Sequence, residues 1–161
     1  MDNGNVFHFV LLGNGARKQA LAAKAAQMGL SNVVFIDSVP KAEVARHWSL
    51  LDVSIIHLKR TELFTTVIPS KLFECMGMGI PILHGVAGES AAIVEKEGVG
   101  LVFEPENAAE LCEKLIQLKN NAALYEKLRG RCILAARNYD RTVLARRMLG
   151  ILEEVAGKNE K

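Results

Sequence analysis

The sequence has few cysteines, which excludes the folds and sites that depend on them. Cys75, Cys112 and Cys132 are the only three in 161 residues, and their spacing matches no zinc site. An odd number of separated cysteines also argues against a secreted scaffold held by disulfides and fits a reducing cytoplasm. We therefore expect these thiols to behave as small hydrophobic side chains.

Long apolar runs and a strong charge of one sign are also missing. No stretch approaches the ~18 apolar residues of a membrane-spanning helix, and the polar residues 1–5 lack the apolar core of a signal peptide. Lys and Arg number 20 against 18 Asp and Glu, a net charge of only +2, which is low for a nucleic-acid-binding protein. A single globular domain suits this length, and residues 1–5 are expected to be a disordered start.

What the sequence does contain is an alternation of short apolar stretches with helix-forming ones. The apolar stretches are rich in β-branched residues and are not interrupted by regularly spaced polar ones. Continuous apolar strands, each followed by a helix, are typical of a parallel sheet covered on both faces. The predicted fold is α/β, a doubly wound Rossmann-like sheet, with strands at residues 6–12, 33–36, 52–58, 80–83 and 99–103.

From Asn107 onward the pattern becomes entirely helical. Helices are predicted at residues 108–119, 122–138 and 142–155, because apolar residues recur there at helical spacing. The domain is predicted to cover residues 6–156, followed by a frayed tail at 157–161. The arginines of this region could lie on a solvated helix face, or they could contact a partner domain or an anionic membrane surface, and both interpretations remain open. These are Arg129, Arg131, Arg137, Arg141, Arg146 and Arg147.

In a doubly wound sheet, ligands bind beyond the carboxyl ends of the strands, so the loops there form the candidate site. These loops are residues 13–15, 37–40, 59–70 and 84–90. The first, Gly13-Asn14-Gly15, allows a tight turn and close approach of a ligand to the backbone. It departs from a dinucleotide fingerprint, because position 18 is Lys18 and Asp37 ends the next strand only loosely. A nicotinamide site is therefore disfavoured, while simple turn chemistry and a ligand contact both remain open.

The long connection at residues 59–69 leads into the sequence "PSKLFE", which predicts the start of a helix. Pro69 is preorganised for the first helical position, so the N–H groups of Ser70 and Lys71 would be free at the positive helix end. Such an end, with a lysine beside it, suits a phosphate. Glu74 lies four residues after Ser70 and shares its face, where a carboxylate can accept hydrogen bonds from a diol such as ribose. The alternative is a surface ion pair between Lys71 and Glu74.

Histidines and metal ligands add little to this site. His57 and His84 each end a strand at the ligand edge, where packed or solvated histidines are more common than catalytic ones. The sequence shows no Ser-His-Asp order, no metal-ligand cluster and no signature of nucleotide hydrolysis. No catalytic residue is assigned, and neither a metal nor another cofactor is expected.

The sequence also resembles a known family. It is similar to the carboxyl-terminal, donor-binding half of a GT-B glycosyltransferase, and most of all to the family-four retaining transferases of bacterial envelope polysaccharides. The resemblance runs from Val6 to about Leu152 and is most specific at "PSKLFE" with the following "GMGIP". It rests on these segments, which occur in the family's order: "FHFVLLGNG", "NVVFIDSVP", "LLDVSIIHL", "IPSKLFECMGMGIPIL", "GVGLVFEPENAAELCEKL" and "NYDRTVLARRML".

The resemblance implies which residues bind a nucleotide-sugar donor. Glu74 matches the glutamate that holds the donor ribose. Ser70 and the backbone amides around Ile68 and Lys71 match the helix start that faces the diphosphate. The remaining donor-binding residues come from two earlier loops: Val39 and Pro40 lie beside the base, and Gly13 and Gly15 form the glycine turn near the donor.

Two departures from the family pattern matter. Many members carry a further glutamate eight positions before the ribose ligand, where it touches the donor sugar. Thr66 occupies that position here, so the contact is absent or supplied by another residue, and Glu62 is too far upstream to replace it by simple register. The sequence also shows no counterpart of the family's first strand and helix, which bring a basic pair that neutralises the diphosphate, or of the acceptor domain, so the chain is expected to be a fragment cut inside the donor domain.

The implied function is the donor-binding half of a retaining glycosyltransferase. The full enzyme would transfer a sugar from a UDP- or GDP-sugar to a saccharide or lipid-linked acceptor, in the cytoplasm or at the inner face of the membrane through peripheral contact. Its partners would be the nucleotide-sugar donor and an amino-terminal acceptor domain, without nucleic acid. The fragment alone is expected to bind nucleotide weakly and to transfer no sugar. Half of a nucleotide-sugar epimerase-like enzyme and a non-catalytic, degenerate transferase module remain alternatives.

Overall fold

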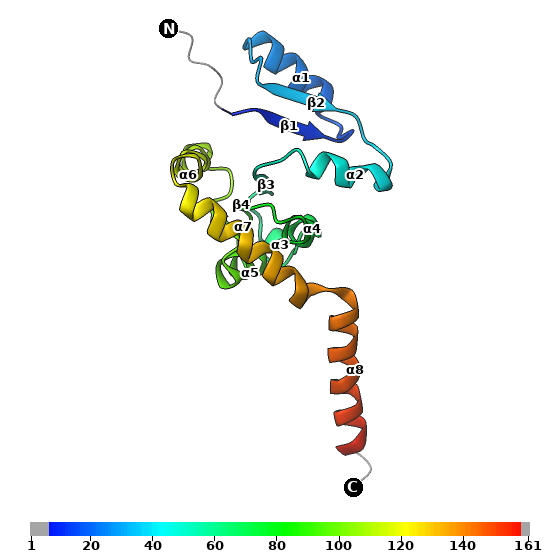
Figure 1. Cartoon of the computed structure of the whole chain (residues 1–161). Coiled ribbons are helices and arrows are strands. Elements are labelled where there is room, and N and C mark those ends of the chain that lie inside the picture. The colour runs from blue at the N-terminus through cyan, green and yellow to red at the C-terminus, as the bar shows by residue number, and fades with distance from the viewer. Residues whose placement is uncertain (1–6, 159–161) are drawn as a thin grey trace. The chain divides into compact units, whose positions relative to one another are not determined.

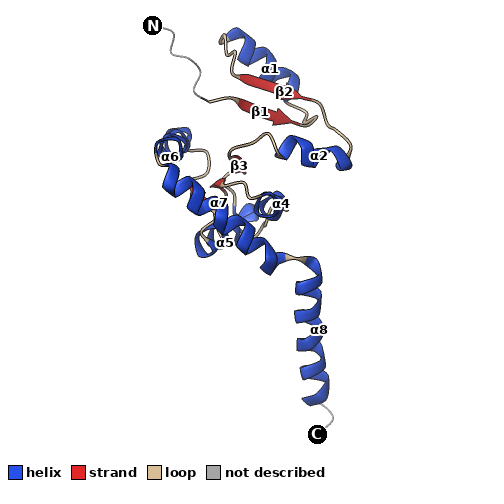
Figure 2. Cartoon of the chain, viewed as in Figure 1, coloured by secondary structure: helices blue, strands red, loops and turns tan. Residues whose placement is uncertain are grey.

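The computed structural model describes residues 7–158, in which strands and helices alternate up to residue 102 and helices follow (Figure 1). The contacts divide the chain into two compact units, Met1–His47 and Trp48–Lys161, and each unit has a sheet of its own. Figure 2 shows the elements by type. The residues expected to form a disordered start, 1–5, lie outside the described range.

The first unit contains a pair of parallel strands. β1 (Phe9–Leu12) aligns with β2 (Val33–Ile36) so that Phe9 faces Val33 and Leu12 faces Ile36. α1 (Lys18–Gln27) connects the two strands, and α2 (Lys41–Trp48) follows β2. This is the strand-helix-strand unit that the apolar pattern predicts.

The second unit contains a three-stranded parallel sheet in the order β3-β4-β5, formed by β3 (Ser54–His57), β4 (Ile82–Gly85) and β5 (Gly100–Val102). All residues of the central strand β4 are buried. Gly100 allows β5 to approach it closely, because a Cβ atom at this position would lie 2.0 Å from the carbonyl oxygen of Ile82.

Helices connect these strands and then form the carboxyl-terminal part of the unit. Their bounds are α3 (Glu62–Thr65), α4 (Lys71–Met78), α5 (Glu89–Glu97), α6 (Ala108–Asn120), α7 (Ala122–Ala136) and α8 (Arg141–Lys158), with a 3₁₀ turn η1 (Arg137–Tyr139) before α8. α4 and α5 each end at a glycine in the left-handed conformation, Gly79 and Gly98. None of the helices in the described residues is both long and apolar enough to cross a membrane.

The core of the second unit lies between its sheet and the helices α4, α5 and α7. Ile56, Ile82, Leu72, Met76 and Val94 are among its fully buried side chains. A cysteine connects α7 to the sheet region, since the Sγ–H of Cys132 donates to the carbonyl oxygens of Ile80 at 3.4 Å and Val99 at 3.3 Å. Cys75 and Cys132 are thus buried as the sequence predicts, whereas Cys112 is exposed, contrary to that expectation.

The predicted fold class is confirmed, with parallel sheets, helices on both sides and a helical carboxyl-terminal end. Three details differ from the expectation. The strands pair in two sheets, the four-residue helix α3 was not predicted, and the tail expected to fray from Gly157 is helical through Lys158. The expected domain bounds, 6–156, stay a prediction.

Candidate functional site

The first turn of α4 carries free backbone donors. Ser70 already has helical dihedral angles, φ −57° and ψ −31°, and its side chain makes no cap. The carbonyl oxygen of Pro69 accepts the N–H of Leu72 at 3.0 Å, so the turn begins at the proline. Within residues 7–158, the N–H groups of Ser70 and Lys71 have no hydrogen-bond acceptor. These donors lie at the positive end of the helix dipole, where an anion binds most readily.

The two sides of α4 have opposite character. The side chains of Leu72, Cys75 and Met76 are buried in the core, whereas Ser70, Lys71 and Glu74 are exposed. The ion pairs formed among the described residues do not include one between Lys71 and Glu74. The ammonium and carboxylate groups are therefore both available to a ligand, and the surface pair that was the alternative reading is not formed.

The segment just before α4 includes two further predicted site residues. Ile68 is partly buried and packs against the core, which holds the backbone before the helix in place. Thr66 is exposed, and its hydroxyl donates to the carbonyl oxygen of Leu63 at 3.3 Å. The helix α3 ends at Thr65 and Thr66 follows it as the C-cap, so Glu62 lies about one helical turn before Thr66.

Glycines bring the loops after β3, β4 and β5 together at the carboxyl edge of the sheet. A Cβ atom on Gly88 would lie 2.1 Å from the carbonyl oxygen of Thr65, so the turn before α5 touches the end of α3 directly. A Cβ atom on Gly85 would lie 2.3 Å from the ring of Phe103. The connection that precedes α4 is therefore packed against its neighbours.

A polar network connects the start of this connection to the turn after β5. The N–H of Glu106 donates to Nε2 of His57 at 3.0 Å, and Oε2 of Glu106 accepts the N–H of Arg60 at 3.1 Å. The guanidinium of Arg60 pairs with Glu104 at 2.8 Å. Sequence reasoning placed His57 and the loop that contains Arg60 at this edge but did not identify Glu104 or Glu106. The only sequence signal was the turn "EPEN", whose proline and asparagine mark a break before α6.

His84 does not reach the ligand edge. It is fully buried, its Nε2 lies 2.8 Å from Oγ of Ser90, and its Nδ1 has no hydrogen-bond partner. Burial lowers the pKa of His84 to about 4, because the charged imidazolium would lose its hydration. A neutral histidine packed beneath α5 fits the structural role that the sequence favoured.

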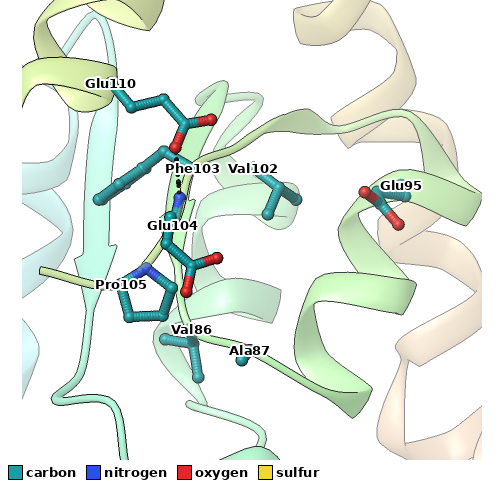
Figure 3. A pocket seen from close by; sticks show the side chains of 8 residues that line it. All are labelled: Val86, Ala87, Glu95, Val102, Phe103, Glu104, Pro105 and Glu110. Carbon is teal, nitrogen blue, oxygen red and sulfur yellow. Dashed lines mark hydrogen bonds between the residues drawn. The ribbon is translucent and has the colours of Figure 1, made fainter. Parts of the chain in front are cut away.

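A hollow of about 280 Å³ lies beside the turn after β5. Figure 3 shows the side chains that line it, which are apolar ones, including Val86 and Pro105, together with Glu95, Glu104 and Glu110. None of the predicted donor-binding residues lines it. Three carboxylates would repel a diphosphate, so the first turn of α4 is the better candidate for an anion.

The other predicted donor-binding residues belong to the first unit. Gly13 has a φ of +141°, which glycine adopts readily, and its N–H donates to the carbonyl oxygen of Ile36 at 3.0 Å. Gly15 and Pro40 are exposed and Val39 is half-buried, all just after the carboxyl ends of β1 and β2. Their role in donor binding stays a prediction.

Asp37, which directly follows β2, forms an ion pair with Lys18, with 2.7 Å between Oδ1 and Nζ. That no nicotinamide cofactor binds at this loop stays a prediction. In the part of the chain that the structure describes, no three side chains of His, Cys, Asp or Glu gather as a metal site would require. That no metal takes part stays a prediction.

Comparison with known proteins identifies a family and a fold. Residues 2–121 match the model of the family described as glycosyl transferases group 1. The structure of Alr3699/HepE from Anabaena, solved in complex with UDP, superposes with a TM-score of 0.78 at 16% identity over 92% of this chain and 41% of that chain. The chain thus spans less than half the length of this relative. A comparison with curated protein sequences finds no match.

Two further structures share the fold. The catalytic domain of cholesterol-alpha-glucosyltransferase from Helicobacter pylori gives a TM-score of 0.61 at 18% identity, over 81% of this chain and 79% of that chain. The pneumococcal O-GlcNAc transferase GtfA, in complex with UDP and GlcNAc, gives 0.69 at 16% identity, over 92% of this chain and 29% of that chain.

Proposed function

Because the chain belongs to the glycosyl transferases group 1 family, we propose that it forms the donor-binding part of a retaining glycosyltransferase. The sugar would pass from a UDP- or GDP-sugar to a saccharide or lipid-linked acceptor. The observation that carries this proposal is the first turn of α4, where unbonded N–H groups, an unpaired lysine and an unpaired glutamate share one exposed side.

Each of these groups suits one part of a nucleotide-sugar. The N–H groups of Ser70 and Lys71, near the backbone of Ile68, would hold the diphosphate, with the ammonium of Lys71 adding a full positive charge. Glu74, one turn further along the same side, would accept two hydrogen bonds from the ribose hydroxyls. Thr66 would lie near the transferred sugar.

The proposed chemistry depends on charge rather than on a protein nucleophile. When the bond between the sugar and the diphosphate breaks, negative charge grows on the departing phosphate oxygen. Fixed backbone donors and a nearby cation stabilise that charge without having to reorganise, which lowers the barrier. The scheme needs no metal. The proposal also assigns donor contacts to four residues of the first unit, as the family resemblance implies: Gly13, Gly15, Val39 and Pro40.

The proposal includes an acceptor-binding domain as a partner. Large apolar side chains are exposed along α8, among them Met148, Ile151 and Val155, and such a surface is usually covered by another part of a protein. Arg146 and Arg147 lie on the same helix. Peripheral contact with the inner face of a membrane, in the cytoplasm and during cell-envelope polysaccharide synthesis, belongs to the same proposal.

Calorimetric titration of the chain with UDP and GDP tests the proposed function. UDP is the first probe, since the Anabaena and pneumococcal structures contain it. Glu74→Ala should weaken binding by roughly tenfold or more, because hydrogen bonds to a charged group are lost. Glu126→Ala, which removes an exposed carboxylate of α7, is the matched control and should bind as the wild type does. The proposal is contradicted if the chain binds neither UDP nor GDP, or if Glu74→Ala binds nucleotide as tightly as the wild type does.

A further inference from the structure

Glu106 has an unusual backbone conformation for its residue type. Its φ is +67°, and among the described residues it is the only non-glycine residue with a positive φ. Residues other than glycine are disfavoured in this left-handed conformation, because their Cβ atom comes too close to the following carbonyl oxygen. Strain of this kind persists where surrounding contacts maintain it, and it concentrates near functional sites. The contacts of Glu106 indicate what the conformation is for.

Glu106 binds the first residues of the β3–α4 connection at two points. Its N–H donates to Nε2 of His57, the last residue of β3, at 3.0 Å. Its carboxylate accepts the N–H of Arg60 at 3.1 Å. The left-handed turn is what directs both groups toward the same connection. The ion pair between Arg60 and Glu104 is exposed on both sides, so it adds little by itself.

The turn that carries Glu106 is itself held firmly on α6. The N–H of Asn107 donates to the carbonyl oxygen of Glu104 at 3.0 Å, and the N–H of Glu104 donates to the carboxylate of Glu110 at 2.8 Å. The side chain of Asn107 in turn accepts the N–H of Glu110 at 3.1 Å. Figure 3 shows the bond between Glu104 and Glu110. The turn therefore provides a rigid anchor for the connection.

We propose that Glu106 is a positioning residue for the nucleotide-sugar site. It fixes residues 57–60, and the contact of Gly88 with Thr65 fixes the middle of the same connection. Between these two points and the start of α4 only a few residues remain, so the position of the free N–H groups of Ser70 and Lys71 depends on both. In this role Glu106 would act through the connection, without contacting the donor. The inference rests on the proposed function of α4.

Two substitutions separate positioning from stability. Glu106→Ala removes the carboxylate but leaves a residue that is strained in the left-handed conformation. Glu106→Gly removes the carboxylate and the strain. Both variants should bind UDP roughly threefold to tenfold more weakly than the wild type. Glu106→Gly should nevertheless unfold about 2–4 °C above Glu106→Ala, because glycine adopts the left-handed region without strain. Glu106→Gln keeps an acceptor for the Arg60 N–H and should bind within about twofold of the wild type.

Hydrogen exchange supplies a readout that does not depend on nucleotide. Amides of residues 58–68 should exchange faster in Glu106→Ala and Glu106→Gly, while those of α8 should not change. If the wild type binds neither UDP nor GDP, the proposed function is contradicted and this inference with it; if it binds only GDP, the variants are titrated with GDP instead. Wild-type affinity in Glu106→Ala and Glu106→Gly, with Glu74→Ala still weakened, overturns the inference alone. Weak binding by Glu106→Ala together with normal binding by Glu106→Gly also overturns it, since affinity would then follow stability.

Discussion

Nε2 of His84 lies 2.8 Å from Oγ of Ser90, and both residues are buried. This hydrogen bond connects the end of β4 to the first turn of α5, directly beneath the glycine turn that touches Thr65. Because Nδ1 of the same ring has no partner, the site can accommodate a neutral imidazole but not a charged one. The stability of the second unit therefore depends on the protonation state of His84.

The second unit should lose stability in mild acid. The pKa of His84 is about 4 in the folded chain against an ordinary value of 6.5, so between these values the unfolded chain binds more protons. The contribution is complete above pH 6.5 and is lost as the pH falls toward 4, which amounts to about 2 kcal/mol between pH 7 and pH 5. Urea unfolding followed by the fluorescence of Trp48, which packs against this core, measures the loss.

Substitution of this histidine provides the control for the acid effect. His84→Gln cannot titrate and should show a flatter dependence between pH 7 and pH 5. The equivalent change at the exposed His8 should leave the dependence as it is in the wild type. An unchanged dependence in His84→Gln would assign the acid sensitivity to other groups.

Alanine should have opposite effects at two glycines of the second unit. At Gly88 the φ is +87° and the new Cβ atom would collide with the carbonyl oxygen of Thr65, so Gly88→Ala should destabilise the unit by about 2 kcal/mol or more. At Gly77, inside α4, a Cβ atom meets nothing within 4 Å, and Gly77→Ala should stabilise it by roughly 0.5–1 kcal/mol. Denaturant midpoints of the two variants against the wild type check both signs.

The thiols should differ sharply in reactivity. Burial raises the pKa of Cys75 to about 11 and that of Cys132 to about 12, so neither forms the reactive thiolate at neutral pH. Cys112 is exposed on α6. A colorimetric disulfide reagent at pH 8 should label one thiol in the folded chain and all three in urea. Labelling of more than one thiol under native conditions, or any labelling of folded Cys112→Ser, would contradict this expectation.

Nucleoside and nucleotide should distinguish the roles of Lys71 and Glu74. If Glu74 binds the ribose, Glu74→Ala should weaken the binding of both uridine and UDP. If Lys71 acts on the diphosphate, Lys71→Gln should weaken the binding of UDP and leave the binding of uridine nearly unchanged. Rising salt should then reduce the difference in UDP affinity between the wild type and Lys71→Gln. Titration of both variants with both ligands measures this. Equal weakening of uridine and UDP by Lys71→Gln would remove the phosphate assignment.

Much of the fold could be predicted because it depends on local patterns. The short apolar stretch around Ile82 indicates a buried strand, and the spacing of Leu111, Leu115 and Leu118 indicates a helix. The exposed side of α4 also follows from local spacing, since residues four apart share a face. The helix α3 could not be predicted in this way. Its four residues are too few for a periodic signal, and the hydroxyl of Thr65 bonds to the carbonyl oxygen of Glu62 within it.

The sequence by itself determined the parallel α/β class, the start of a helix directly after Pro69 and the common face of Ser70 and Glu74, because each depends on residues close together in the chain. Only the tertiary structure decided that Lys71 and Glu74 remain unpaired, that His84 is buried against Ser90 rather than exposed at the edge, and that Glu106 holds His57 and Arg60. Those contacts join residues up to 49 positions apart. No local pattern encodes them, since they depend on how the strands align and how closely the glycines let the loops approach.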